Sequence, residues 1–586
     1  MRDLFDRRKF IKATALSGAA IGVMGPLQFA FGNKHIHEPI VVYTRSKTDA
    51  LTTYDESMVV ACLQGIINRK SPLVYIAPSA SKWPGYWLDI LSTKDGWLNG
   101  RPVQQITDLD ALFALAKGKV KGAVIWDPAV PASINVATTI AGVEDGIVLS
   151  PELAEKYLSQ WELPVIKDLR GMFTGKATGS AKNDAYRWAV REYLSKGLCS
   201  GHWLCLYEDA FFTRERGDVA YVVTRDWAIT NRSFVYDLSP WGDEKPKDDP
   251  EQPFGTDLAT YHIMLSELLK QTSGKEMTEV AGFFSFSKYS NVPNYPSKHD
   301  PVPTEWETVY LISPYNCYQN TVAHNCFNQS FHSKAPSLPL KQHRPKLVQE
   351  RQNKTYLCIL MADYDSTTPL YEFLPEHWSD ERRGEIPLIW GINPNLVETY
   401  PDLIHYFYTS ASENDYFGAD ASAAGYMNPN RIKEEYLPLF IHHNKKFYQH
   451  LDMTLSPMVL DWDEPTDRVK DAFTKFSPDG LATIVLDFHN QGGKNPEPHV
   501  WKGMPVMELI NSACNFSSLE QTAKDMSDAI PEKSEDAPAF HFFRIVWTSP
   551  GQVIDSIDLL RKNRPDLDIE VADPYNFFRI FKAYHE

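Results

Sequence analysis

The sequence predicts a parallel α/β protein, in which an N-terminal parallel α/β part precedes a C-terminal TIM-barrel-like (β/α) domain. Residues 346–586 repeat one pattern: a short apolar run, then acidic or aromatic residues, then a helix-like stretch. The clearest runs are YLCILM (356–361), PLIWGI (387–392), PMVL (457–460) and ATIVL (482–486). Strands that are buried on both faces have such continuous apolar sequences. A spacing of about thirty residues is typical of βα units, and roughly six to eight units would close as a (β/α)₈-type barrel or a relative.

Residues 33–170 alternate strand and helix signals, which predicts a first α/β domain. Strands are expected at 39–44, 73–77, 122–127, 146–150 and 164–169, with helices such as 56–69 and 134–141 between them. Ser150-Pro151 predicts a helix start, because serine caps helix N-termini and proline is tolerated in the first turn. Alternation of this kind is typical of a parallel layer.

Residues 171–345 are more mixed and predict an α+β domain. A Gly-, Ser- and Lys-rich linker covers 171–184, strands are expected at 203–209, 219–229 and 282–291, and a helix at 257–272. The stretch 338–353 is basic, polar and contains proline. We therefore place the start of the last domain at residue 346.

The C-terminal domain, residues 346–586, is expected to hold strands near 357, 387, 415, 457, 483, 541 and 569. The helices expected between them cover 395–410, 430–451, 466–476, 506–512, 552–562 and 575–583. Parallel α/β folds carry their chemistry beyond the carboxyl ends of the strands. The residues that directly follow the apolar runs are therefore the candidates for a site.

Composition and motifs exclude several functions. The chain has 586 residues and a net charge of −16, whereas nucleic-acid binding needs a basic surface. The sequence has no GxGxxG at a helix start in 33–170 and no GxxxxGK[ST] anywhere, so we expect no nucleotide and no other cofactor. The seven cysteines show no zinc-binding spacing; Cys199/Cys205 and Cys317/Cys326 form either small-loop disulfides or buried thiols.

The N-terminus has the pattern of a twin-arginine export signal. Arg7-Arg8-Lys9-Phe10-Ile11-Lys12 precedes the uncharged stretch ATALSGAAIGVMGPL, and Ala30-Phe31-Gly32 offers small residues for cleavage. This predicts a signal peptide over 1–32, recognition by the twin-arginine translocase, and a periplasmic or extracellular protein. The apolar stretch is short and interrupted by glycine and proline, so we expect no membrane span in the mature protein.

Asp363 and Asp365 are the leading catalytic candidates. They follow the run at 356–361, and residues i and i+2 of an extended chain point the same way. Glycosidic hydrolysis uses two carboxyl groups, one as the acid and one as the nucleophile or base. Crowding of two carboxylates raises one pKa, as an acid needs. A cation site or a loop cap is the alternative interpretation.

Asp461 and Trp462 follow the run at 457–460. Asp461 is a candidate partner carboxylate, and the Trp462 ring could serve as a platform for a sugar. Glu464, three residues further on, is better explained as the acidic start of the next helix.

Asp487 follows the run at 482–486 and is another candidate catalytic carboxylate. His489 and Asn490 come directly after it and are candidate ligands for sugar hydroxyls. His541 and Arg544 belong to the run at 541–547 and are further candidates for this rim.

The segment Ala423-Ala424-Gly425-Tyr426-Met427-Asn428-Pro429 resembles the namesake motif of the GxGYxYP family of glycoside hydrolases. Asp363-x-Asp365 resembles that family's acidic strand-end motif, and residues 384–390 with Asn393-Pro394 resemble its next segment. Residues 63–69 and Val136-Ala137 resemble its amino-terminal domain. The resemblance implies an exported carbohydrate-active protein in which Trp390 and Tyr426 bind sugar near the two aspartates.

The chain departs from the family pattern at several positions. Ala423 replaces the first motif glycine, Asn428 replaces the second tyrosine, and ADYDS (362–366) stands where the family has Asp-Gly-Asp-Asn. The acidic positions are kept. The sequence therefore predicts a glycoside hydrolase acting on an oligo- or polysaccharide. The alternatives are a non-catalytic carbohydrate-binding protein with a degenerate site, or a metal-dependent polysaccharide deacetylase or esterase whose metal ligands the sequence does not identify.

Overall fold

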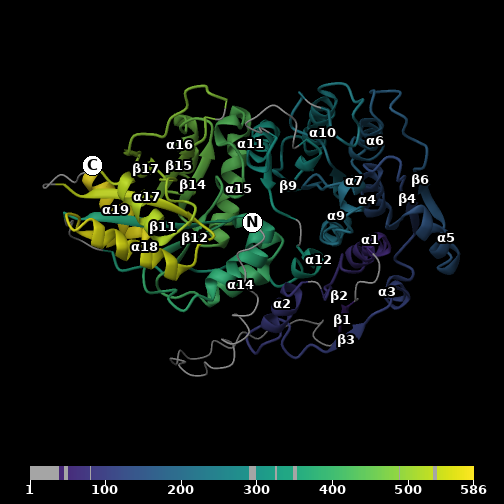
Figure 1. Cartoon of the computed structure of the whole chain (residues 1–586), viewed down its shortest axis with the longest axis horizontal. Helices are drawn as coiled ribbons and strands as arrows, with labels where there is room; N and C mark the ends of the chain where they lie inside the picture. Colours follow the sequence, from purple (N-terminus) through teal and green to yellow (C-terminus); the bar gives the residue numbers. More distant parts are fainter. Residues whose placement is uncertain are drawn as a thin grey trace. The chain divides into compact units, whose positions relative to one another are not determined.

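The structure is a computed structural model (Figure 1). It describes residues 39–44, 50–79, 81–243, 245–289, 299–323, 326–347, 353–487, 489–531 and 537–586, without the side chains of 50–52. Residues Pro39–Glu586 form one compact unit. The predicted export signal, residues 1–32, lies outside the described residues and stays a prediction.

Two small parallel sheets form the N-terminal part. The first has the order β2-β1-β3, from Val74–Ile76, Ile40–Tyr43 and Val103–Ile106; the second has the order β5-β4-β6, from Gly146–Leu149, Gly122–Ile125 and Val165–Asp168. The connecting helices are α1 (Ala50–Ile67), α2 (Trp83–Leu91), α3 (Leu109–Ala116), α4 (Ser133–Glu144) and α5 (Pro151–Gln160). The predicted start of α5 is confirmed, because the Ser150 side chain accepts a hydrogen bond from the Leu153 N–H and proline occupies the first turn.

The middle part holds a third parallel sheet, with the order β10-β9-β7-β8. Its strands are Cys317–Asn320, Thr278–Gly282, Trp203–Leu206 and Phe234–Tyr236, and α10 (Thr256–Thr272) and α11 (Pro301–Ile312) belong to the same region. The helix expected at 257–272 is thus confirmed. The strand expected over 282–291 lies earlier, because β9 ends at Gly282.

The strand expected at 219–229 is wrong. These residues form α8 (Ala220–Val223) and α9 (Arg225–Asn231). A short apolar run does not by itself distinguish a buried strand from a buried helix. Here Arg225 is buried and donates to the Thr138 hydroxyl and the Glu208 carbonyl, so its charge is satisfied by neighbouring elements.

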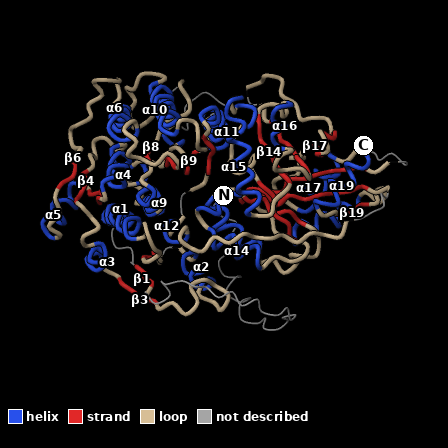
Figure 2. Tube along the Cα trace, turned by 180° about the vertical axis from the view of Figure 1, so that it is seen from behind, coloured by secondary structure: helices blue, strands red, loops and turns tan. Residues whose placement is uncertain are grey.

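The C-terminal part contains two further sheets, in which all but one strand are parallel. One has the order β13-β12-β11-β18, from Asp415–Ala419, Leu388–Ile392, Thr355–Tyr364 and Ala539–Val546, with β19 (Ile569–Val571) also paired to β11. The other has the order β14-β15-β17-β16, from Leu455–Asp461, Gly480–Val485, Met504–Glu508 and His499–Trp501. Figure 2 shows these strands in red, bordered by helices such as α14 (Pro401–Thr409) and α15 (Leu437–His450). The mixed α/β class with parallel sheets is confirmed.

A closed TIM barrel is not confirmed. The two C-terminal sheets are joined by individual hydrogen bonds, such as Ser422 N–H to the Met458 carbonyl and Ile510 N–H to the Phe542 carbonyl, 2.9 and 2.7 Å long. The helix expected at 506–512 is wrong, because β17 pairs with β15 and forms an antiparallel hairpin with β16. That hairpin occupies the place of a regular βα unit.

Strand β11 is buried on both faces, as its continuous apolar sequence predicted. Alternate residues enter two different clusters: Cys358 and Leu360 pack in an inner cluster with Phe577 and Phe578 of α19 (Pro574–His585). Ile359 and Met361, with other residues, enter an outer cluster with the surrounding helices. Val309 of α11 belongs to the inner cluster. A helix of the middle part therefore packs against the interior of the C-terminal strands.

All seven cysteines lie in the described residues as thiols, and six of them are buried. The thiol interpretation of Cys199/Cys205 and Cys317/Cys326 is therefore the one that the structure supports. Among the helices of the described residues, none combines the length and the hydropathy needed to cross a membrane.

Candidate active site

A bulge in β11 turns the two leading aspartates toward the interior. Met361 pairs with Trp390 and Tyr364 pairs with Ile392, so β11 has one more residue than β12 between these pairs. Met361 and Tyr364 both belong to the outer cluster, although strict alternation would place them on opposite faces. Asp363 and Asp365 flank Tyr364, so both lie on the inner face. The predicted common orientation of the two carboxylates follows from this bulge.

Asp363 is held in a left-handed backbone conformation, with φ at +68°. Such a conformation costs a non-glycine residue about 1 kcal/mol or more, and three interactions offset it. Arg544 Nη2 lies 2.6 and 2.7 Å from the two carboxylate oxygens. The Asp363 N–H donates to Asp420 Oδ2 at 2.7 Å, and the Trp547 indole N–H donates to the Asp363 carbonyl at 2.9 Å.

Asp420 follows β13 and is fully buried. Its carboxylate accepts the N–H groups of Asp363 and Ala421. A Cβ at Gly391 of β12 would overlap this carboxylate, so the position requires glycine. Burial, followed by the charges of Asp365 and Asp363, holds the pKa of Asp420 well above its usual range.

Asp365 and Glu305 add two half-buried carboxyl groups to the same place. Asp365 follows β11, and Glu305 lies on α11. Burial, the charge of Asp363 and the charge of Glu305 raise the pKa of Asp365 to about 8. Burial and the charge of Asp363 raise the pKa of Glu305 to about 8, while Arg544 opposes both shifts. Both groups therefore tend to hold a proton at neutral pH. We call Glu305, Asp363, Asp365, Asp420 and Arg544 the acid group.

The loop after Asp365 is fixed by the middle sheet. The Ser366 hydroxyl lies 2.8 Å from that of Thr321, and the Thr367 N–H donates to Asn320 Oδ1 at 3.0 Å. Asn320 ends β10. The position of Asp365 therefore depends on contacts outside the C-terminal strands.

Tyr426 of the sequence motif is buried beside the acid group. Burial and the charges of Glu305 and Asp365 raise the pKa of its phenol well above the usual range. Its backbone exchanges two hydrogen bonds with Gln319 of β10, 2.8 and 3.2 Å long. Gly425 has φ at +113°, and a Cβ there would overlap the Tyr318 ring. The motif thus joins the middle sheet to the C-terminal part, and sugar binding by Tyr426 stays a prediction.

Trp390 does not lie at the rim. It pairs with Met361, enters the outer cluster and is 0 % exposed. Its indole N–H donates to Asp415 Oδ1 at 2.8 Å, and its ring centroid lies 5.0 Å from that of Trp378. Strand alternation directs this side chain toward the helices, away from the expected position at the rim, and sugar binding by Trp390 stays a prediction.

Asp461 and Asp487 bind backbone N–H groups of nearby loops. Asp461 is buried and accepts from Asn430 and Trp462, each at 2.8 Å; burial raises its pKa to about 7. Asp487 is half-buried and accepts from the N–H groups of Gln491 and Gly492. In these contacts both act as loop caps, and their catalytic roles stay predictions.

Trp462 and His489 lie together, as the sequence suggested. Their ring centroids are 4.5 Å apart in a stacked arrangement, and Tyr310 contacts both rings edge-on. His489 Nε2 lies 2.9 Å from Glu307 of α11, and Asn490 beside it is exposed. We call Tyr310, Trp462 and His489 the aromatic group. Helix α11 thus reaches both groups, through Glu305 and through Glu307 and Tyr310.

Three residues of the site were missing from the sequence interpretation: Glu305, Asp420 and Trp547. Asp420 directly follows β13 and Trp547 directly follows β18, so the strand-end rule applied to Asp363 could have found both. Glu305 has no such signal, because it lies on a helix far earlier in the chain. Within the described ranges, no three His, Cys, Asp or Glu side chains are arranged to hold a metal ion.

Three family models match the chain. The model described as "GxGYxYP putative glycoside hydrolase C-terminal domain" matches residues 353–582. The models for the first and second GxGYxYP_N domains match residues 41–117 and 120–197. No curated protein sequence matches the chain.

Two solved structures align with the chain. One, described as a putative hydrolase from Bacteroides thetaiotaomicron, is 17% identical, with a TM-score of 0.68 over 94% of this chain and 95% of that chain. At this identity the likeness shows a shared fold. The other, described as a putative polysaccharide deacetylase from Mycobacterium smegmatis, is 9% identical over 42% of this chain and 95% of its own, with a TM-score of 0.28. That score is too low to indicate a shared fold.

We expect Asp365→Asn to stabilise the protein at pH 8. Between about pH 4 and 8 the folded protein binds a proton at Asp365 that the unfolded chain has released, so stability falls as pH rises through this window. An asparagine carries no charge to be buried at any of these pH values. The expected gain is roughly 1–2 kcal/mol at pH 8, discounted for partial exposure, and close to zero at pH 4. Urea unfolding of both proteins at the two pH values measures it, and a gain that is equal at both would contradict the assignment.

Proposed function

The chain belongs to the GxGYxYP putative glycoside hydrolase family, as the sequence resemblance indicated, and we propose that it cleaves glycosidic bonds of an oligo- or polysaccharide at the acid group. A hydrolase-like role agrees with the family and with the fold shared with the Bacteroides protein. The observation that carries the proposal is the raised pKa of Asp365 and Glu305 beside the Asp363–Arg544 ion pair.

Glycoside hydrolysis needs one protonated and one ionised carboxyl group. The acid donates its proton to the glycosidic oxygen as the bond from that oxygen to the anomeric carbon breaks, and the carboxylate attacks that carbon or takes a proton from the attacking water. Asp365 and Glu305 can fill these two roles once one of them has lost its proton, which their pKa values place near pH 8. The charge of Glu305 raises the pKa of Asp365, and the charge of Asp363 raises the pKa of both groups, so loss of the proton from Glu305 favours its retention on Asp365.

Asp363 is proposed as a positioning residue. Both of its carboxylate oxygens are bound by Arg544, which fixes the carboxylate in place. Its negative charge nevertheless raises the pKa of Asp365, Glu305 and Asp420. The pair thereby sets the proton affinity of the groups around it.

The aromatic group, with Asn490, is proposed to bind a sugar ring at a distance along α11 from the acid group. Trp462 is buried, whereas His489 and Asn490 are exposed and would make the contact with the sugar. Because burial and nearby negative charge already raise the pKa of Asp365, Glu305 and Asp420, a uronate carboxylate would be unfavourable beside them, and we expect neutral sugars to bind there in preference to uronates.

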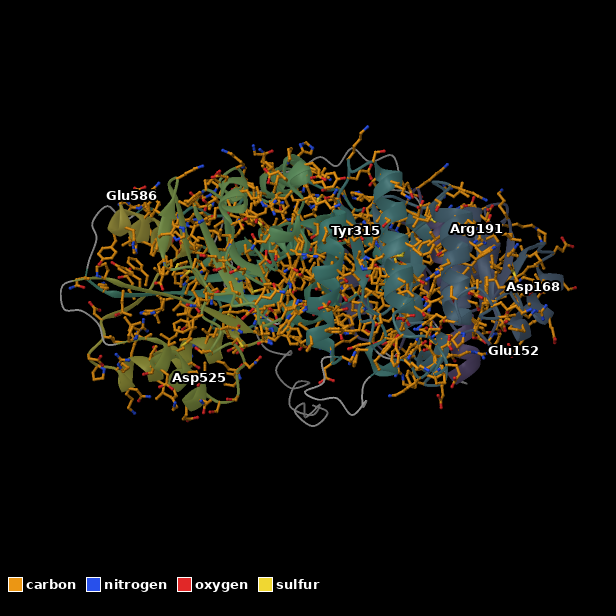
Figure 3. The ribbon with its side chains drawn as sticks, turned by 90° about the horizontal axis from the view of Figure 1, so that it is seen from above. Glu152, Asp168, Arg191, Tyr315, Asp525 and Glu586 are labelled. Atoms are coloured by element: carbon orange, nitrogen blue, oxygen red, sulfur yellow. The ribbon has the colours of Figure 1, made fainter. Side chains whose placement is uncertain are left out.

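We expect Asp365→Asn and Glu305→Gln each to lower kcat by at least about a hundredfold, because each removes one member of the acid–carboxylate pair. The loss of kcat is measured as the release of aryl groups from a panel of aryl glycosides and of reducing sugars from neutral polysaccharides. Asp525→Asn on α17 (Leu519–Ala529), at the edge of the molecule in Figure 3, is the matched control. Polysaccharide binding by the wild type without any turnover would favour the carbohydrate-binding alternative.

Asp363→Asn is expected to keep measurable activity and to move the basic limb of the pH profile to lower pH. In the wild type, kcat/KM should peak near pH 8, where one of the two protons has left, and should fall at higher pH, where the acid loses the other. Removing the Asp363 charge leaves Arg544 to lower the pKa of the same acid. A profile of kcat/KM against pH for both proteins tests this. If the variant is as inactive as Asp365→Asn, Asp363 is itself catalytic.

We also propose export by the twin-arginine route, which the residues of the N-terminal motif support. Replacing both Arg7 and Arg8 by lysine is expected to leave the protein in the cytoplasmic fraction. Lys12→Arg serves as the control, because it keeps the arginine pair. Immunoblots of cell fractions from the native host measure the distribution, and equal export of all three proteins would rule the route out.

A further inference from the structure

Trp547 is unusual among the tryptophans of the chain. All fifteen lie in the described residues, and Trp547 alone has an exposed side chain, at 46 %. Exposure of a large indole to water gives no hydrophobic stabilisation. The exposed part of the ring therefore gains no stability from packing.

The Trp547 backbone is also in an unfavourable conformation. Its φ is +43°, in the left-handed region that bulky residues rarely adopt. Such residues persist only where the surroundings fix them, and they concentrate at functional sites. The following turn is fixed on both sides: the Thr548 hydroxyl donates to the Val546 carbonyl, and Ser549 caps α18 (Pro550–Asn563).

The indole ring is tied to the acid group. Its N–H donates to the Asp363 carbonyl at 2.9 Å, and its ring meets that of Phe373 edge-on, with centroids 4.8 Å apart. Arg544, three residues earlier on β18, binds the Asp363 carboxylate. Asp363 and Trp547, which both have positive φ, are thus hydrogen-bonded to each other.

We propose that Trp547 is an aromatic platform on which a neutral pyranose ring of the substrate stacks beside the acid group. Rigid, exposed indoles bind sugars through the apolar C–H face of the ring, and a fixed orientation reduces the entropy lost on binding. The hydrogen bond to Asp363 fixes the indole relative to the carboxyl groups. This inference rests on the proposed function, since it places a substrate ring next to the groups proposed to cleave it.

Binding is best measured in the Asp365→Asn background, where the polysaccharide is not consumed. The probes are laminarin, xylan, galactomannan and hydroxyethylcellulose, cast singly in native gels, with retardation giving the affinity. Trp547→Ala is expected to weaken the binding of at least one of them by about tenfold or more, and Trp547→Phe by less. The control is Trp501→Ala, since Trp501 is half-buried on β16 and bonded to Asp471.

Equal retardation of the Trp547→Ala and Trp501→Ala proteins would overturn the proposed platform. So would the absence of retardation of the Asp365→Asn protein, with Trp547 intact, by all four polymers. A blue shift of tryptophan emission on adding the retarding polymer, present with Trp547 and absent in Trp547→Phe, would support it. The two proposals fail separately. If Asp365→Asn still cleaves substrate but Trp547→Ala weakens binding, the acid assignment is wrong and the platform stands.

Discussion

The ion pair between Asp363 and Arg544 is the interaction on which the site depends. It joins β11 to β18 at the point where the bulge reverses the direction of the β11 side chains. Without Arg544, the half-buried Asp363 carboxylate would be unpaired, and the left-handed backbone conformation at Asp363 would lose a stabilising interaction. With Arg544 in place, Asp363 can present its N–H to Asp420 and its carbonyl to Trp547. One ion pair therefore positions groups from three strand ends.

The site is built by two regions of the chain that are far apart in sequence. The C-terminal strands supply Asp363, Asp365, Asp420 and Arg544, whereas α11 supplies Glu305. Contacts with β10 hold the loop after Asp365 and the backbone of Tyr426. The conformation at Gly425, where a side chain would overlap Tyr318, shows how closely the two regions approach. Acid–base chemistry at this rim thus requires the middle region to be folded in place.

A second cluster at the ends of parallel strands shows why acidity alone does not mark a site. Lys288 lies 2.6–2.9 Å from Asp209, Asp237 and Asp248, with all four side chains at most 3 % exposed. Inside the middle region the lysine binds all three carboxyl groups and offsets part of their charge, as in a structural ion network. At the acid group, Asp365 and Glu305 keep protons at neutral pH instead. Accessibility also distinguishes the acid group, because Asp365 and Glu305 are half-buried whereas the Lys288 network is almost fully buried, and only an accessible proton can be donated to a substrate.

The sequence by itself determined the parallel α/β class, most of the C-terminal strands, the family and the two leading aspartates. Continuous apolar runs and strand-end acids are local patterns, and local patterns survive in the sequence. The tertiary structure decided the rest. The bulge at Asp363 sets which side chains face inward, so Asp365 joins the acid group and Trp390 enters the outer cluster. Glu305 reaches the site only because α11 packs across it, and its pKa arises from burial and from charges distant in sequence. The direction in which a side chain points, its burial and its distance from other charges all depend on contacts between helices and strands. The spacing of residues along the sequence does not specify those contacts.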